Sequence, residues 1–405
     1  MKIKVDYTNY INSLILLFFI AVVFKRTAMD LVFLSVSFTG IYFAIKEKKL
    51  PFQIKEVQLL TLLFWGYFIA VIFSIIAHPK STEVAGFLSR EVYFLLAPFA
   101  SMAIIKAKIN LNWLVLGSKL GLFLIGIIVI YESFLGASRP SGFLNAITFA
   151  NLAVLLFFIV LVASLNDIKK QQIIPIIASL SVGGLSIMYI GGRSAWIAFV
   201  FLLLVVVYLQ FKQRFSIKLK TILLGLLIIG LLGSFNSVIN QRAGLAYNNV
   251  AEWFNGDLTM SSAGQRLEMM RIGAIEAPNV PFFGNGYRNI NQSIITDKYN
   301  HKVHDKIRLY THLHNAYLTN FIGGGYPLFF ALLLNLFVPF LVFKKALMRN
   351  KNQLYASIGI IITVGYMIFG LINHLFGDVF MNAFYTFSMA ILLPKLQTDK
   401  DEMYT

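Results

Sequence analysis

Long apolar runs recur along the whole of this 405-residue chain. A helix needs about 20 residues to cross the hydrocarbon of a bilayer, and most of the runs approach that length. Inside lipid each backbone N–H and C=O must be satisfied within its own segment, so the runs are predicted to be helical. Hydrophobic residues make up 58% of the chain and charged residues only 13%, against about 25% in soluble domains. The sequence therefore predicts an all-α, polytopic membrane protein.

About twelve membrane-spanning helices are predicted, with one long polar loop between the ninth and the tenth. The loop divides the chain into a first transmembrane bundle at 1–239, the loop itself with short helices at 240–316, and the last spans with a short tail at 317–405. The predicted spans lie at 10–25, 28–45, 57–77, 90–105, 112–135, 145–165, 173–191, 194–211, 219–239, 318–343, 354–374 and 378–394.

The net charge of +17 is distributed in a way that indicates membrane topology. Lysine and arginine gather in alternate loops, for example at 46–55 and 212–220, as expected of loops that stay in the cytoplasm. With an even number of spans, both termini are predicted to be cytoplasmic and the 240–316 loop to lie outside. Most basic residues are thus assigned to topology and to contact with anionic membrane lipids, and no nucleic-acid partner is predicted.

The long loop is predicted to contain a helix that begins at Ser261 or Ser262 and carries an apolar stripe of Leu267, Met270 and Ile275. Prolines after it are predicted to stop it. One interpretation is an amphipathic helix on the membrane surface, followed by a polar link. The arginines of the loop favour another interpretation, phosphate binding, because Arg pairs bidentately with phosphate oxygens. A cationic patch close to the bilayer would suit an anionic lipid headgroup.

A further arginine, Arg193, follows Gly191 and Gly192 and precedes an apolar run. Glycine allows backbone to approach a ligand closely, so this arginine is also a candidate for phosphate binding. An interfacial arginine that extends its charge to the membrane surface would give the same pattern.

No metal site is predicted, since the loop has neither a carboxylate cluster suited to Mg²⁺ nor the H-E-x-x-H pattern of many zinc sites. His301 and His304, with Asp305 beside them, leave a metal site as an alternative to a solvated loop. Cysteine is absent from the sequence, so a disulfide framework is excluded.

Two of the six histidines, His312 and His314, directly precede the tenth predicted span. A neutral imidazole at the mouth of a helical bundle can take a proton from an incoming hydroxyl near neutral pH. His314 is therefore the candidate general base, and a hydrogen bond that caps the helix is the alternative. If both residues are helical, His312 faces elsewhere and only one of the pair acts.

A histidine–asparagine pair before a glycine–proline turn resembles the signature of the bacterial O-antigen ligases. The residues of the match are His314, Asn315, Gly325, Tyr326 and Pro327. The sequence departs from the family at Leu328, where a second glycine is usual.

Other blocks match the family in the same order, from roughly residue 139 to residue 380. They are Arg139, Gly142 and Asn145 in SRPSGFLNAITFAN, Arg193 in GGRSAWIAF, Arg266 in SSAGQRLEMMRIG, Arg288 near the turn in PNVPFFGNGYRN, and Asp378 in GLINHLFGDVF.

The resemblance implies a GT-C-like glycosyltransferase of the bacterial inner membrane, with its active site on the periplasmic face. The donor would be O-antigen on undecaprenyl diphosphate and the acceptor lipid A–core oligosaccharide, in an inverting transfer that needs neither metal nor cofactor. His314 would act as the base, and Arg193, Arg266 and Arg288 would stabilise the departing diphosphate. Supporting residues would be Arg139, Asn315, Asp378 and His312, with an N-cap role open for Asp378.

Alternatives remain at this point. An O-antigen polymerase would use the same kind of donor to elongate a lipid-linked chain, and a related transferase would attach glycan to protein. A secondary transporter would need charges near the membrane midplane, where only Lys119 is a candidate. A non-enzymatic scaffold would tolerate substitution of His314 and Arg266.

Overall fold

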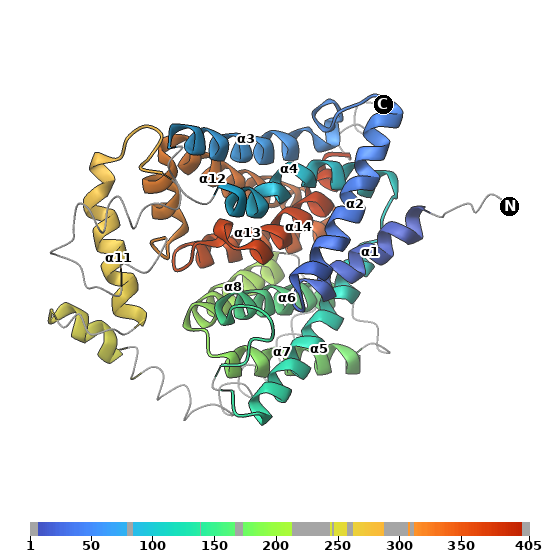
Figure 1. The fold of residues 1–405 in the computed structure, drawn as a ribbon. Helices are drawn as coiled ribbons and strands as arrows, with labels where there is room; N and C mark the ends of the chain where they lie inside the picture. The colour runs from blue at the N-terminus through green and yellow to red at the C-terminus, as the bar shows by residue number, and fades with distance from the viewer. Residues whose placement is uncertain are drawn as a thin grey trace.

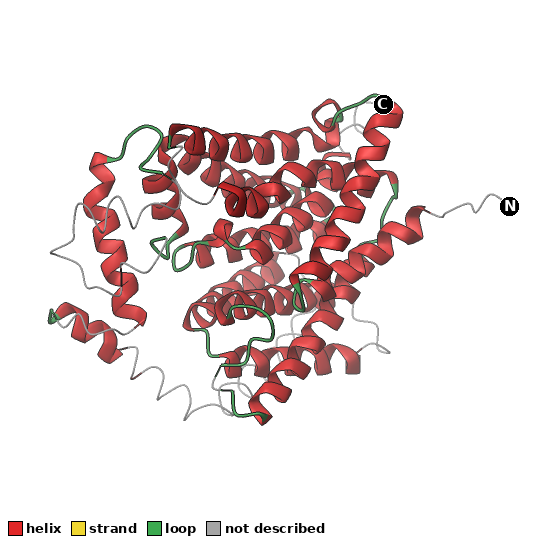
Figure 2. Ribbon diagram, in the orientation of Figure 1, coloured by secondary structure: helices red, strands yellow, loops and turns green. Residues whose placement is uncertain are grey.

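The computed structural model describes residues 7–78, 84–137, 139–166, 173–212, 244, 247–256, 262–286, 307 and 312–398. Within these residues all regular structure is helical (Figures 1 and 2). The helices are α1 (Tyr7–Ala21), α2 (Arg26–Glu47), α3 (Lys55–Ala77), α4 (Val84–Lys106), α5 (Asn112–Phe134), α6 (Ala146–Asn166), α7 (Ile173–Ile190), α8 (Arg193–Lys212), α11 (Ser262–Glu276), α12 (Ala316–Met348), α13 (Gln353–Gly370) and α14 (Val379–Thr398), with 3-10 turns at Pro51–Gln53, Ala277–Asn279 and Leu375–Gly377.

Eight of these helices are long and apolar enough to cross a membrane, and α1, α7 and α8 are shorter apolar helices. The protein is thus a multi-pass membrane protein, as predicted. Each predicted span coincides with one helix except the span at 219–239, which lies outside the described residues.

The centre of the bundle is α6, which contacts α5, α7, α8 and α13. Its residues from Thr148 to Leu165 are all buried, as expected of an apolar helix surrounded by other helices. By contrast α2 leaves large side chains such as Leu31 and Ile45 exposed, 68% and 73% respectively. These surfaces would face lipid tails, which an apolar side chain prefers to water.

One end of the bundle carries several buried polar contacts between helices, and we call it the polar end. Here α3 and α13 end, and α4, α6, α12 and α14 begin. Three hydrogen bonds join these helix ends: Thr148 Oγ1 to Asp378 Oδ2 at 2.6 Å, Asn315 Nδ2 to Leu371 O at 3.0 Å, and Asn382 Nδ2 to Arg90 O at 2.8 Å. Segments that are distant in the sequence therefore meet at this end.

Near the polar end α12 is broken at Gly325, whose φ of 68° and ψ of −163° are not helical. Pro327 follows, and proline cannot supply the next helical N–H. The predicted break therefore exists, although Leu328 replaces the second glycine of the family and buries its side chain completely.

Backbone groups freed by this break are satisfied by residues 280–286, which we call the clasp. The N–H groups of Asn285 and Gly286 donate to the carbonyls of Ile322 and Gly323 at 2.8 and 3.0 Å, and Tyr326 N donates to Phe282 O at 3.0 Å. Such pairing makes non-helical backbone acceptable beside a membrane.

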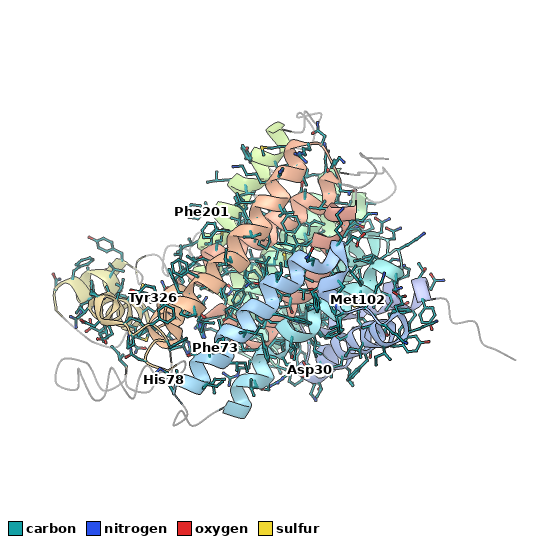
Figure 3. The ribbon with its side chains drawn as sticks, turned by 90° about the horizontal axis from the view of Figure 1, so that it is seen from above. Asp30, Phe73, His78, Met102, Phe201 and Tyr326 are labelled. Atoms are coloured by element: carbon teal, nitrogen blue, oxygen red, sulfur yellow. The ribbon has the colours of Figure 1, made fainter. Side chains whose placement is uncertain are left out.

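The clasp fits against α12 only because two residues lack a side chain. A Cβ atom at Gly325 would lie 2.1 Å from Phe282 O, and one at Gly284 would lie 2.4 Å from Gly323 O. At the end of α3, His78 Nε2 lies 2.9 Å from Gly284 O. Figure 3 shows His78 and Tyr326 on the side of the bundle next to the loop helices.

The loop helix α11 begins at Ser262 and ends at Glu276, just before the prolines predicted to stop it. The predicted apolar stripe is wrong in register, since Ile275 is 44% exposed while Met269 and Ile272 are completely or almost completely buried. The packed face includes Gly273, where a Cβ would lie only 3.1 Å from Leu313 and 3.2 Å from Leu318. Close approach to α12 (Figure 1) selects this face, which local sequence periodicity does not reveal.

Candidate active site at the polar end

The His312–His314 segment precedes α12 and is not helical, so the expectation that the two histidines face apart is wrong. Their ring centroids are 4.4 Å apart. Between them, Leu313 is fully buried in an apolar cluster with Met269, Ile272 and other residues. Burial of this one side chain turns its two neighbours toward each other.

His314 has a φ of +48°, a left-handed conformation that is uncommon for residues other than glycine. The other non-glycine residues with positive φ among the described residues, such as Lys48 and Asn350, lie at the opposite end of the bundle. Strained backbone of this kind often occurs at functional sites. His314 is therefore held in an unusual conformation at the place where the sequence predicts a catalytic base.

The helix-capping role that was an alternative for His314 belongs to Asn315. Its Oδ1 accepts a hydrogen bond from Leu318 N at 2.9 Å, as an N-cap asparagine does. Its Nδ2 donates to Leu371 O at 3.0 Å, in the segment between α13 and α14. Asn315 thus fixes both the start of α12 and its position against the next helix.

A third imidazole, His374, completes what we call the imidazole cluster with His312 and His314. Its ring centroid lies 5.4 Å from that of His312. The ring also lies directly over Gly377, where a Cβ atom would be 2.2–2.4 Å from it. Sequence reasoning missed His374, although it stands four residues before Asp378 within the GLINHLFGDVF block.

Arg266 on α11 approaches the cluster from the loop side, and its positive charge acts on His314. The helix that carries it is anchored by Glu268, whose side chain is 3% exposed. Arg271 Nε and Trp253 Nε1 donate to that carboxylate at 2.9 and 3.2 Å. The Trp253 contact, together with the apolar face of α11, holds Arg266 in place.

Arg90 near the start of α4 approaches the cluster from the bundle side. Its positive charge acts on His312, His374 and Asp378. Sequence reasoning did not select Arg90. Its position beside Glu91 inside an otherwise apolar segment is the signal that could have found it, because charges in such segments are usually functional.

Asp378 is the N-cap of α14, which is the alternative role that the sequence left open for it. Its Oδ1 accepts from Phe380 N at 2.9 Å and Met381 N at 3.1 Å. Its Oδ2 accepts from Thr148 Oγ1 at 2.6 Å. Burial nevertheless raises the pKa of this carboxyl above its usual value, despite the hydrogen bonds that lower it.

All three imidazoles are held in the neutral form. Burial lowers the pKa of His314 to about 4, with a further contribution from the charge of Arg266. Burial also lowers the pKa of His312 to about 3, helped by His314 and Arg90. The pKa of His374 is lowered well below its usual value, again chiefly by burial. Near neutral pH these rings are proton acceptors rather than cations.

Comparison with known proteins now bears on this arrangement. Residues 176–333 match the family model described as O-Antigen ligase. This segment is thus similar to an O-antigen ligase domain. The resemblance seen in the sequence motifs is thus confirmed. The match also supports a glycosyltransferase-like enzyme of the O-antigen ligase and polymerase superfamily. A protein of Haemophilus influenzae described as uncharacterised is 26% identical over 399 residues, which cover 92% of this chain and 96% of that protein.

The O-antigen ligase domain contains Arg193, Arg266, Arg288 and His314, whereas Arg90 and His374 come from outside it. Arg193 begins α8 two residues after Gly191, whose φ is +68°. Arg288 lies outside the described residues, as do His301 and His304.

Arg139, also outside the O-antigen ligase domain, lies in an ordered turn between α5 and α6. Glu132 Oε2 accepts hydrogen bonds from Ser141 N at 2.7 Å and Gly142 N at 3.1 Å. Asn145 Oδ1 accepts from Ile147 N at 2.9 Å at the start of α6. The glycine and asparagine of this block therefore shape the turn that presents Arg139, which is exposed.

Among the described residues, no group of three or more His, Cys, Asp or Glu side chains is arranged to hold a metal ion. The imidazole cluster is bordered instead by guanidinium groups. Such groups can bind an anion and stabilise developing negative charge, while a neutral imidazole accepts a proton. This combination suits group transfer from a phosphorylated leaving group.

Proposed function

We propose that this protein is an O-antigen ligase that transfers O-antigen from undecaprenyl diphosphate to a hydroxyl of lipid A–core oligosaccharide. In the proposed step the acceptor oxygen attacks the anomeric carbon of the donor sugar and inverts it. The bond from that carbon to the diphosphate oxygen breaks, and the diphosphate leaves with the electron pair. The acceptor proton passes to an imidazole nitrogen of His314.

One observation carries the proposal most directly: His314, in a strained backbone conformation at the polar end of the bundle, is within reach of the positive charge of Arg266. His314 then acts as the general base, a role worth about 10²–10⁴ in rate. Arg266 stabilises the negative charge that grows on the leaving diphosphate. Arg193 and Arg288 are assigned to the same diphosphate, and Arg139 and His312 support the site.

The proposal places the polar end at the periplasmic face of the inner membrane, with both termini in the cytoplasm. Helix α11, between the first bundle and the last spans in the chain, then lies at the active site, in a GT-C-like arrangement. The donor lipid reaches the site from the bilayer and needs no nucleotide. Neither a metal nor another cofactor takes part in the proposed step.

An O-antigen polymerase is the second candidate, because the matched family supports the superfamily that includes both activities. The two differ only in acceptor, which is lipid A–core for a ligase and a second lipid-linked glycan for a polymerase. The histidine–asparagine pair before the glycine–proline turn favours the ligase.

The test is transfer in vitro with purified protein, lipid-linked O-antigen and lipid A–core, in the presence of a chelator. Product without added metal is expected. An absolute need for Mg²⁺ would contradict the arginine mechanism. Replacing lipid A–core by a second lipid-linked glycan separates the two activities, and uptake of a small solute into vesicles without any transfer would favour a transporter instead.

A further inference from the structure

Arg90 lies on the face of α4 that packs against the loop carrying His374. One turn further along the same face, the Phe94 ring contacts the rings of Phe376 at 5.2 Å and Tyr67 at 4.6 Å between centroids. Because Cα–Cβ bonds in a helix tilt toward its N-terminus, the Arg90 side chain extends from this packed face toward the polar end. It therefore extends toward the imidazole cluster.

A single side-chain amide fixes the backbone of Arg90 to that loop. Asn382, fully buried at the start of α14, has its Nδ2 2.8 Å from Arg90 O, 3.1 Å from Phe376 O and 3.2 Å from Glu91 Oε2. The three contacts tie α4, the His374 loop and α14 together. The guanidinium is thus carried by a rigid part of the bundle, in contrast to Arg266, which is carried by the loop helix α11.

Positive charge faces the imidazole cluster from two separate elements. Arg266 acts on His314 from α11, and Arg90 acts on His312 and His374 from α4. Among the acidic groups at this end, Asp378 caps α14 and the Oε2 of Glu91 faces Asn382. Two cations that reach neutral rings from separate helices form a site suited to an anion with two charged groups.

We propose that Arg90 is a further diphosphate-binding residue that acts with Arg266, and that Asn382 is the positioning residue that holds it. The inference rests on the proposed function and assigns the donor's diphosphate to a site between Arg90 on the bundle and Arg266 on the loop helix α11. An anion bound between the two guanidinium groups would offset the positive charges that suppress protonation of the imidazoles. His314 would then become a stronger base when the donor is bound.

The test is binding of undecaprenyl diphosphate without sugar to the purified full-length protein in nanodiscs, with undecaprenyl phosphate as the second ligand. Arg90→Gln is expected to weaken binding of the diphosphate lipid about tenfold to hundredfold, the usual range for a lost charge-assisted hydrogen bond. It should also abolish the preference for diphosphate over monophosphate. Arg90→Lys should restore part of the affinity, because Lys keeps the charge without the bidentate geometry.

The matched control is Arg26→Gln. Arg26 begins α2 at the same end of the bundle and forms an ion pair with Asp30 at 3.4 Å. Its substitution should leave both affinities within about twofold, as for most surface ion pairs. Because Asn382 bonds the backbone of Arg90 rather than its side chain, Arg90→Gln should retain the wild-type thermal midpoint.

Unchanged binding by Arg90→Gln, or an equal loss for both lipids, would overturn the inference and leave the proposed function standing if the wild type transfers glycan. If the wild type neither binds undecaprenyl diphosphate nor transfers from its glycosylated form, the proposed function itself fails.

Discussion

The clasp and the imidazole cluster both depend on unusual backbone near the start of α12, yet they use it differently. In the clasp, glycines with positive φ let two backbone segments pair at 2.8–3.0 Å. In the imidazole cluster, a histidine with positive φ presents a ring beside two others. Positive φ at glycine, which has no steric cost, serves assembly here, whereas positive φ at a residue with a reactive side chain indicates a site.

Each region also contains a histidine, which allows one substitution to be compared in two places. His78 contacts Gly284 O in the clasp, and His314 belongs to the imidazole cluster. If this contrast is correct, His78 stabilises the fold and His314 takes part in the reaction. The following predictions test this contrast, in order of decreasing expected effect.

His314→Asn should lower the transfer rate by about 10²–10⁴ through loss of the general base. Asparagine tolerates the left-handed conformation, so the thermal midpoint should remain near that of the wild type. His78→Asn removes one hydrogen bond worth roughly 1 kcal/mol and should lower the midpoint slightly while the rate stays within a few-fold. Equal rate losses in the two variants would abolish the distinction. Steady-state transfer and thermal unfolding of each variant provide the measurements.

Arg266→Lys should lower the rate about tenfold or more, because Lys cannot pair bidentately with the leaving diphosphate. Arg271→Lys, five residues along the same helix, keeps a cation beside Glu268 and should change the rate less than twofold. Transfer assays at saturating acceptor would measure both effects. Similar losses for the two substitutions would mean that α11 has only a structural role.

Gly325→Ala should destabilise the protein by a few kcal/mol, since its Cβ would meet Phe282 O at 2.1 Å and its φ is positive. Gly66→Ala on α3 is the control, because nothing lies within 4 Å of a Cβ there, and it should be neutral or slightly stabilising. Thermal unfolding in detergent compares the two. Activity of Gly325→Ala should fall in parallel with its stability, unlike that of His314→Asn.

Lowering the pH from about 6.5 to about 4 should reduce stability modestly. The folded-state pKa of His314 is about 4, below the value near 6.5 of an unfolded histidine. Between these two pH values the unfolded chain therefore binds more protons than the folded chain. The stability that the neutral ring provides above about pH 6.5 is lost as the pH falls. His314→Asn should flatten part of this dependence of the thermal midpoint on pH. An identical pH profile in the variant would show that the pKa of His314 is the same in the folded and unfolded states.

Much of the helical architecture could be predicted from the sequence because the decisive forces are local. Long apolar runs must satisfy their own backbone in lipid, and they predicted the helices from α1 to α8 and from α12 to α14. The stop after α11 and the break at Gly325 also followed from residues whose backbone preferences are intrinsic. The motif order predicted the family for the same reason, since it is a property of the chain itself.

The composition of the candidate site was decided by tertiary structure. Arg90 and Asn382 are separated by 292 positions in the chain, and no local pattern links them or brings His374 beside His312. The packed face of α11 was likewise set by Gly273 against α12 rather than by its own apolar residues. Local preferences determine where helices begin and end, whereas packing between distant helices determines which side chains share one small volume and how their charges interact.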